Sequence, residues 1–180
     1  MMDEILSDSY LDNDHVDSFA ILLNEKARIS LEQYHKYLYI SPMHYKLKDE
    51  SLKLFLEHID YSSVHSCSII INPIIDGSHW TILVGYRKQK KWEFYDSVPN
   101  HMNRSIAVKI IASLNKDYKK AFDENITKWS FKTIKKAPTQ TNNTDCSMFV
   151  CKYMENIVRQ NNSKWKESTD WHEKMLKYRA

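Results

Sequence analysis

Three short segments rich in β-branched and aromatic residues lie between residues 67 and 98, and they constrain the fold more than any other feature. They are "CSIIINPI", "HWTILVGYR" and "KWEFYDSV", which begin at Cys67, His79 and Lys91. Such residues favour strands, and the close spacing of the last two segments predicts a hairpin. "DG" at residues 76 and 77 indicates a turn just before His79. We therefore expect a mostly antiparallel sheet.

Helical patterns lie on both sides of these strands in the sequence. Apolar residues recur at helical spacing over residues 14–27, after a polar "DND" cluster that can cap a helix start. Further helices are predicted over residues 49–59, 105–114, after residue 145 and in the tail 161–180. A strand is predicted over residues 129–134, and no regular structure is predicted for the aromatic segment 34–45.

Length and charge favour one ordinary globular domain. The chain has 180 residues, 42% of them hydrophobic, with only 2 Gly and 4 Pro and no linker-like stretch. We therefore expect a single domain over residues 1–180, and a monomer. The formal charge of +3 is spread along the chain, and the basic run 87–91 is interpreted as a solvated hairpin loop. No nucleic-acid partner is expected.

The terminal and cysteine patterns indicate a compartment. The first residues, "MMDEILSDSY", lack the features of a signal peptide, and no segment is apolar enough to span a membrane. We expect an intracellular protein of the nucleus or cytoplasm that is not secreted and binds no membrane. Three cysteines without a CxxC pair argue against a disulfide framework and a zinc site. We expect neither a metal nor a cofactor.

The segment "TNNTDCSMFVCKYMENIV", residues 141–158, places a cysteine where a helix begins. Asp145 is the predicted N-cap, and Cys146 is then the first helical residue. A thiol at a helix N-terminus lies near the positive end of the helix dipole, which favours the thiolate and makes a nucleophile. For a lone cysteine, a buried core thiol is the competing interpretation. Cys151, one turn later, is expected to be buried.

A nucleophilic cysteine needs a histidine and a group that orients the imidazole. A hairpin that pairs Ile82 with Glu93 also pairs His79 with Asp96, so we predict that His79 and Asp96 face each other at its open end. Taken singly, they would be a solvated histidine and a turn residue. Gln140, six residues before Cys146, is a candidate side-chain donor to an oxyanion.

The order of these residues resembles one family. "HW" at 79–80, "YDS" at 95–97, Gln140, and "DC" at 145–146 followed by "FVCKY" are similar to the proteases of ubiquitin-like modifiers, the SUMO or sentrin proteases. Adenovirus protease shares their fold. "YLDNDHVDSFAILL", residues 10–23, is similar to the first conserved block of that family. The resemblance therefore extends over nearly the whole chain.

The resemblance implies an α+β, papain-like, adenain-type fold. Its mixed, mainly antiparallel sheet is flanked by helices, with the nucleophile at the N-terminus of a central helix. It also implies a role for each matching residue, with His79 as base and acid, Asp96 orienting it, Cys146 as nucleophile and Gln140 in the oxyanion hole. The expected reaction is hydrolysis after the C-terminal Gly-Gly of SUMO or a related modifier, in a precursor or a conjugate, through a thioester.

The resemblance also implies how the substrate tail is held. Trp80 would cover a narrow tunnel for the Gly-Gly tail, and Tyr10 would form the second wall. A flat aromatic lid admits glycine but excludes a residue with a Cβ.

Two departures from the family pattern leave alternatives open. The family usually has Gly after the nucleophile, where this chain has Ser147, and Trp where it has Tyr10. A side chain at residue 147 can crowd the oxyanion hole or the first helical turn, although serine is small and acceptable in the first turn of a helix. One alternative is therefore an inactive homologue that binds a ubiquitin-like modifier. A less favoured alternative is an acetyltransferase of the bacterial-effector type, which uses the same order of His, acid and Cys.

Overall fold

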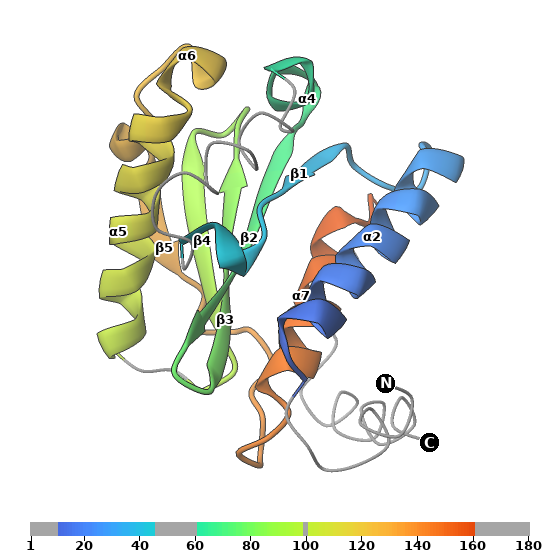
Figure 1. The fold of residues 1–180 in the computed structure, drawn as a ribbon, viewed down its shortest axis with the longest axis vertical. Coiled ribbons are helices and arrows are strands. Elements are labelled where there is room, and N and C mark those ends of the chain that lie inside the picture. Colours follow the sequence, from blue (N-terminus) through green and yellow to red (C-terminus); the bar gives the residue numbers. More distant parts are fainter. Residues whose placement is uncertain (1–10, 46–60, 99–100, 161–180) are drawn as a thin grey trace.

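The computed structural model describes residues 11–45, 61–98 and 101–160. In these ranges the helices and strands follow in the order α2 (Asn13–Ile29), β1 (Tyr37–Tyr39), η1 (Pro42–Tyr45), α4 (Tyr61–Ser66), β2 (Ile69–Asp76), β3 (His79–Tyr86), β4 (Lys91–Asp96), α5 (His101–Asp117), α6 (Lys119–Phe122), η2 (Ile126–Lys128), β5 (Ser130–Thr133) and α7 (Cys146–Val158). Figure 1 shows a central sheet with helices on both sides.

The sheet has five strands in the order β1-β2-β3-β4-β5. The two antiparallel ladders, β2–β3 and β3–β4, contain eight and six residue pairs. The outer strands β1 and β5 add parallel ladders of three and four pairs. The sheet is therefore mixed and mainly antiparallel, and the α+β fold class is confirmed.

The β3–β4 hairpin forms with a register two residues away from the predicted one. Asp96 pairs with Thr81, and Tyr86 pairs with Lys91 across a four-residue loop, Arg87–Lys90. Lys90 lies in the left-handed region at φ 48°, which lets the longer loop close. The predicted pairing of His79 with Asp96 is thus wrong, and His79 pairs with Asp76 of β2 instead. A shift of two residues keeps Asp96 on the same face of the sheet as His79.

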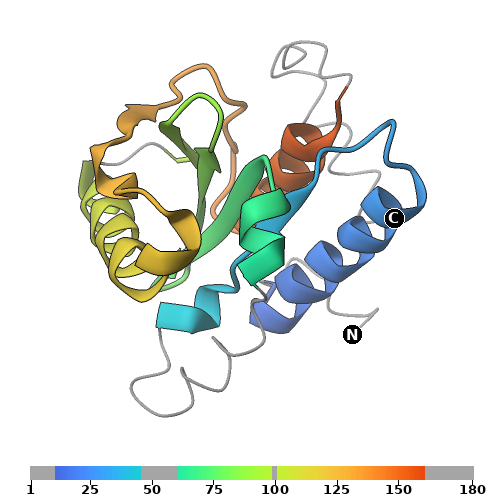
Figure 2. The same ribbon diagram turned by 90° about the horizontal axis from the view of Figure 1, so that it is seen from above.

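The core has two parts, one on each face of the sheet. Alternate strand residues point to opposite faces, so Ile82 and Val84 pack against α2 and α7 while Leu83 packs toward α5. Figures 1 and 2 show α5 along one face, with α7 and α2 together on the other. The catalytic candidates lie at the end of the sheet where β3 and α7 begin.

The predicted helices form where the structure describes them. Asp12 caps α2 by accepting from the His15 N–H at 3.2 Å, and α5 extends beyond the predicted range at both ends. The predicted helices over residues 49–59 and 161–180 lie outside the described residues. Within the described ranges, no helix has both the length and the apolar character needed to cross a membrane.

Candidate active site

Cys146 is the first residue of α7, as predicted. Its side chain is 1% exposed, and its Sγ donates to the Ser78 carbonyl oxygen at 3.7 Å. Asp145 occupies the N-cap position, but its side chain does not cap the helix, which corrects the predicted capping role. Its carboxylate instead accepts from the Asn142 side-chain amide at 2.8 Å, because the backbone of residue 145 is not extended (φ −84°, ψ 1°). The nucleophile candidate is therefore positioned by the loop before α7.

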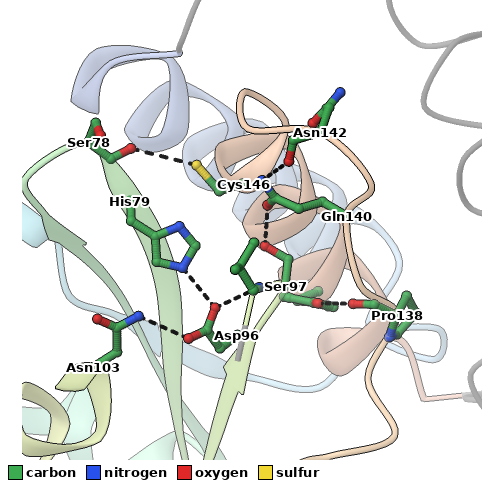
Figure 3. A network of polar contacts seen from close by, with 11 residues as sticks. Ser78, His79, Asp96, Ser97, Asn103, Pro138, Gln140, Asn142 and Cys146 are labelled. Atoms are coloured by element: carbon green, nitrogen blue, oxygen red, sulfur yellow. Dashed lines mark hydrogen bonds and ion pairs between the residues drawn. The ribbon is translucent and has the colours of Figure 1, made fainter. Parts of the chain in front are cut away.

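His79 and Asp96 meet although they are not directly opposite in the ladder. The His79 Nε2 atom lies 2.7 Å from Asp96 Oδ1, and Asp96 is 3% exposed. A carboxylate only accepts, so Nε2 donates its proton and Nδ1 remains for the thiol. Figure 3 shows the ring between Asp96 and Cys146, with its second nitrogen on the Cys146 side. A diagonal neighbour in a sheet is within reach of an imidazole, which explains why the shifted register preserves the contact.

Two more donors hold the Asp96 carboxylate. The Val98 N–H donates to Oδ1 at 2.8 Å, and the Asn103 side-chain amide donates to Oδ2 at 3.0 Å. Asn103 belongs to the first turns of α5, so the opposite helical layer also reaches this carboxylate. The orientation of Asp96 is therefore fixed from three directions.

The environment of His79 favours its protonated form. The hydrogen bond with Asp96 and then the one with Cys146 raise the pKa of His79 to about 9, while burial acts to lower it. An imidazole with this pKa carries a positive charge at neutral pH. A cation beside a thiol favours the thiolate, which is the reactive form.

Gln140 lies on the loop that leads into α7. Its Oε1 accepts from the Ser97 hydroxyl at 2.5 Å, and its Nε2 donates to the Asn142 carbonyl oxygen at 2.7 Å. In Figure 3 its side chain points toward Cys146. An amide nitrogen has two protons, so Nε2 keeps one donor for a further partner. The structure thus brings together all four residues predicted to be catalytic.

Ser147 does not disturb the start of α7. The Phe149 N–H donates to the Asp145 carbonyl oxygen at 2.9 Å, which closes the first helical turn around Ser147. Ser147 is fully buried, and its hydroxyl has no hydrogen-bond partner. The first turn therefore accommodates the side chain that departs from the family pattern.

The two predicted substrate-binding residues have different outcomes. Trp80 is 1% exposed and packs in the core between the sheet and α7. Tyr10 lies outside the described residues. Cys67, Cys146 and Cys151 are free, and burial raises the pKa of Cys151 to about 12, so Cys151 is the inert core thiol that the sequence predicts.

Ser97, Asn103 and Asn142 were missed by the sequence reasoning. Ser97 directly follows Asp96, which was a usable signal, because neighbours of a predicted catalytic residue at a strand end also lie at the candidate site. Nothing in the pattern marks Asn103 or Asn142. Among the residues that the structure describes, no group of three or more His, Cys, Asp or Glu side chains is arranged to hold a metal ion.

This arrangement contains the parts needed for acyl transfer by a cysteine. It provides a thiol at a helix N-terminus, a charged imidazole oriented by a buried carboxylate, and an amide donor that points toward the thiol.

Comparison with known sequences identifies relatives. The model of the family described as the Ulp1 protease family, C-terminal catalytic domain, matches residues 57–179. The putative ubiquitin-like-specific protease 1B of Arabidopsis thaliana is 30% identical over 91 residues, which are 49% of this chain and 27% of the relative. Human sentrin-specific protease 2 is 32% identical over 95 residues, which are 51% of this chain and 16% of the relative. The matched part is thus a small share of each relative.

Solved structures show the same fold. The SUMO protease Ulp1 with its catalytic cysteine oxidised to a sulfenic acid aligns over 99% of this chain and 77% of its own, with a TM-score of 0.67 and 15% identity. The C-terminal Ulp1 protease domain in complex with Smt3, the yeast ortholog of SUMO, aligns over 99% and 76%, with a TM-score of 0.66 and 15% identity. The predicted papain-like fold is confirmed by these similarities.

Proposed function

The chain belongs to the Ulp1 protease family, and on this basis we propose that it is a cysteine peptidase of ubiquitin-like modifiers. Its substrates are SUMO or a related modifier, as a precursor or as a conjugate. It cleaves the peptide or isopeptide bond after the C-terminal Gly-Gly. The single observation that carries the proposal is the contact of His79 with the buried carboxylate of Asp96, at 2.7 Å, beside Cys146.

The reaction proceeds by proton transfer within this group. His79 and Cys146 share one proton, and with that proton on the imidazole the Cys146 thiolate attacks the carbonyl carbon of the terminal glycine. The oxyanion receives hydrogen bonds from the free Nε2 proton of Gln140 and from the backbone N–H of Cys146. The His79 imidazolium then gives its proton to the departing amine, which leaves a thioester. Water activated by His79 hydrolyses the thioester and restores the thiol.

Trp80 supplies the selectivity for glycine in this proposal. It is adjacent to His79 in sequence, and its ring is fixed by burial against the α7 side of the core. A fixed aromatic ring next to the base leaves room for a Gly-Gly tail and excludes larger residues. Tyr10 forms the second wall. Residues 1–180 act as one catalytic domain, in the nucleus or the cytoplasm.

A modifier with an electrophile at its C-terminal glycine tests the proposal. The probe should label the wild-type protein at Cys146 and leave Cys146→Ala unlabelled. Cys151→Ala is the matched control, because it removes a buried thiol of the same helix and should keep the label. A panel of ubiquitin-like modifiers identifies the preferred substrate.

The same experiment separates the alternative function. A wild-type protein that is folded and binds the modifier but takes no label would be an inactive homologue that recognises modifiers. The replacement of the family's glycine by Ser147 is the observation that favours this alternative. A probe that labels Cys146→Ala as strongly as the wild type would contradict the assignment of the nucleophile.

A further inference from the structure

The residue after Asp96 makes a second connection within the site. Ser97 is 1% exposed, and it contacts Gln140 twice. Its carbonyl oxygen accepts from the Gln140 backbone N–H at 3.1 Å, and its hydroxyl lies 2.5 Å from Gln140 Oε1. The two residues are 43 positions apart in sequence, so this is a tertiary contact between the end of β4 and the loop before α7.

The partners of the Gln140 side chain determine which end of its amide faces which neighbour. The Asn142 carbonyl oxygen only accepts, so the group next to it, at 2.7 Å, is the NH₂. The carbonyl end of the amide therefore faces Ser97, whose hydroxyl donates to it. With the amide reversed, two carbonyl oxygens would meet at Asn142. The NH₂ thus keeps its second proton for the side of the site where Cys146 lies (Figure 3).

We propose that Ser97 is a positioning residue, which holds the Gln140 amide with its NH₂ directed at the oxyanion formed on attack by Cys146. This inference rests on the proposed function and adds a role for Ser97 to it. Asp96 and Ser97 are consecutive, and each holds a different part of the site. Asp96 orients the base, and Ser97 orients the oxyanion donor.

The loss of the Ser97 hydroxyl should act on one step only. In Ser97→Ala, Oε1 of Gln140 loses its donor, and the amide is held at one point instead of two. A donor that is mobile must be ordered as the oxyanion forms, which slows acyl transfer but leaves substrate binding and the thiolate unchanged. Alanine is close to serine in volume, so the fold should persist.

A spectroscopic measurement tests the orientation without any substrate. The side-chain amide signals of Gln140, assigned by their loss in Gln140→Ala, report solvent exchange of the Nε2 protons by NMR. Exchange should be about tenfold faster in Ser97→Ala, because an amide that has lost its Oε1 partner turns more freely and its Nε2 proton leaves the Asn142 carbonyl oxygen more often; tenfold corresponds to about one hydrogen bond. Ser41→Ala is the matched control, because Ser41 is also buried and donates to a carboxyl group, that of Asp17, at 2.9 Å. Unchanged exchange in Ser97→Ala would overturn the proposal.

A double-mutant cycle tests whether Ser97 acts through Gln140. With a fluorogenic C-terminal amide of the modifier, Ser97→Ala should lower kcat about fivefold to tenfold and leave KM within about twofold. Alkylation of Cys146 by iodoacetamide, which forms no oxyanion, should also stay within about twofold of wild type. Added to Gln140→Ala, the Ser97→Ala change should have almost no effect on kcat.

The outcomes separate this inference from the proposed function. An equal loss of kcat from Ser97→Ala with and without Gln140 would show that Ser97 does not act through the amide. A wild-type protein that never cleaves the modifier amide would instead defeat the proposed function. In that case the amide-exchange measurement alone decides whether Ser97 holds Gln140.

Discussion

At the scale of single residues, the site depends on which buried polar groups have hydrogen-bond partners and which do not. Asp96 accepts from three donors, while the buried hydroxyl of Ser147 has no partner. A paired buried group fixes geometry, whereas an unpaired one lowers stability. These two residues therefore lead to opposite predictions.

The raised pKa of His79 predicts how stability changes with pH. A histidine whose pKa is about 9 in the folded protein, against 6.5 ordinarily, stabilises the fold below pH 6.5. This stabilisation is lost as the pH rises from 6.5 through 9. In Asp96→Asn the main cause of the shift is weakened, so the free energy of unfolding should decline less over this window. Urea unfolding at several pH values measures the two slopes.

A control for this experiment is Asp14→Asn, which removes an exposed carboxyl in the first turn of α2, on a different element from His79 and Asp96. It should follow the wild-type slope. Identical slopes for wild type and Asp96→Asn would mean that Asp96 does not set the pKa of His79.

Ser147→Ala should stabilise the protein. Ser147 is fully buried without a hydrogen-bond partner, and alanine removes the unsatisfied hydroxyl and has the higher helix propensity. We expect the free energy of unfolding to rise by about 1 kcal/mol. Ser41→Ala, which removes the hydrogen bond from Ser41 to Asp17, should lower the free energy of unfolding. Loss of stability in Ser147→Ala would contradict the absence of a partner.

At the scale of elements, the sequence predicted the helices and strands whose formation depends mainly on residues close together in the chain. The segments that form β2, β3 and β4 are rich in β-branched and aromatic residues, and α7 has a clear helical period, so all four were predictable. β1 was not, because it has only three residues and exists by parallel pairing with β2, 32 positions away in sequence. The register of β3 with β4 depended on the conformation of Lys90, which no residue pattern specifies.

The features of the candidate site also divide into those that the sequence predicts and those that it does not. The types and order of His79, Asp96, Gln140 and Cys146 were available from the sequence, and a face of a strand is preserved under a register error of two. The hydrogen bonds of Ser97 and Asn103 were not, because they depend on side-chain directions at the ends of different elements.

The β3–β4 hairpin also contains a glycine that its partner strand requires. A Cβ on Gly85 would lie 2.5 Å from the ring of Trp92, its cross-strand partner. That ring cannot move easily, because its Nε1 donates to the Ile126 carbonyl oxygen at 2.9 Å and it packs on Trp129. Gly85→Ala should therefore lower the free energy of unfolding by about 1–3 kcal/mol.

A second background tests the cause. In Trp92→Leu the ring is absent, so the further cost of Gly85→Ala should shrink in urea unfolding. Equal costs in both backgrounds would exclude the clash.

At the scale of the whole molecule, the site joins two halves that are otherwise separated by the sheet. Cys146 is carried by the layer of α2 and α7, whereas Asn103 comes from α5 on the other face (Figures 1 and 3). Asp96 lies between them, at the end of β4. The proposed activity therefore requires both layers to be docked on the sheet.

Asn103→Asp should disturb the site from the α5 side. It places a second carboxyl about 3.0 Å from Asp96 Oδ2, where the amide now donates. Two like charges repel, so the orientation of His79 should suffer and kcat should fall by about tenfold or more. Asn115→Asp, a change of the same type farther along α5, should leave kcat unchanged. An Asn103→Asp protein with full kcat would contradict the role of this contact.

The β3–β4 hairpin also determines where residues can be inserted or deleted without disturbing the site. Arg87–Lys90 forms a loop outside the ladder, so residues inserted there leave the pairing of both strands as it is. The step from Lys91 to Asp96 is different, because one added or lost residue within it would turn Asp96 to the opposite face, away from His79. Natural variants of this chain should therefore differ freely in the length of the loop but keep the distance from Lys91 to Asp96, or change it by two.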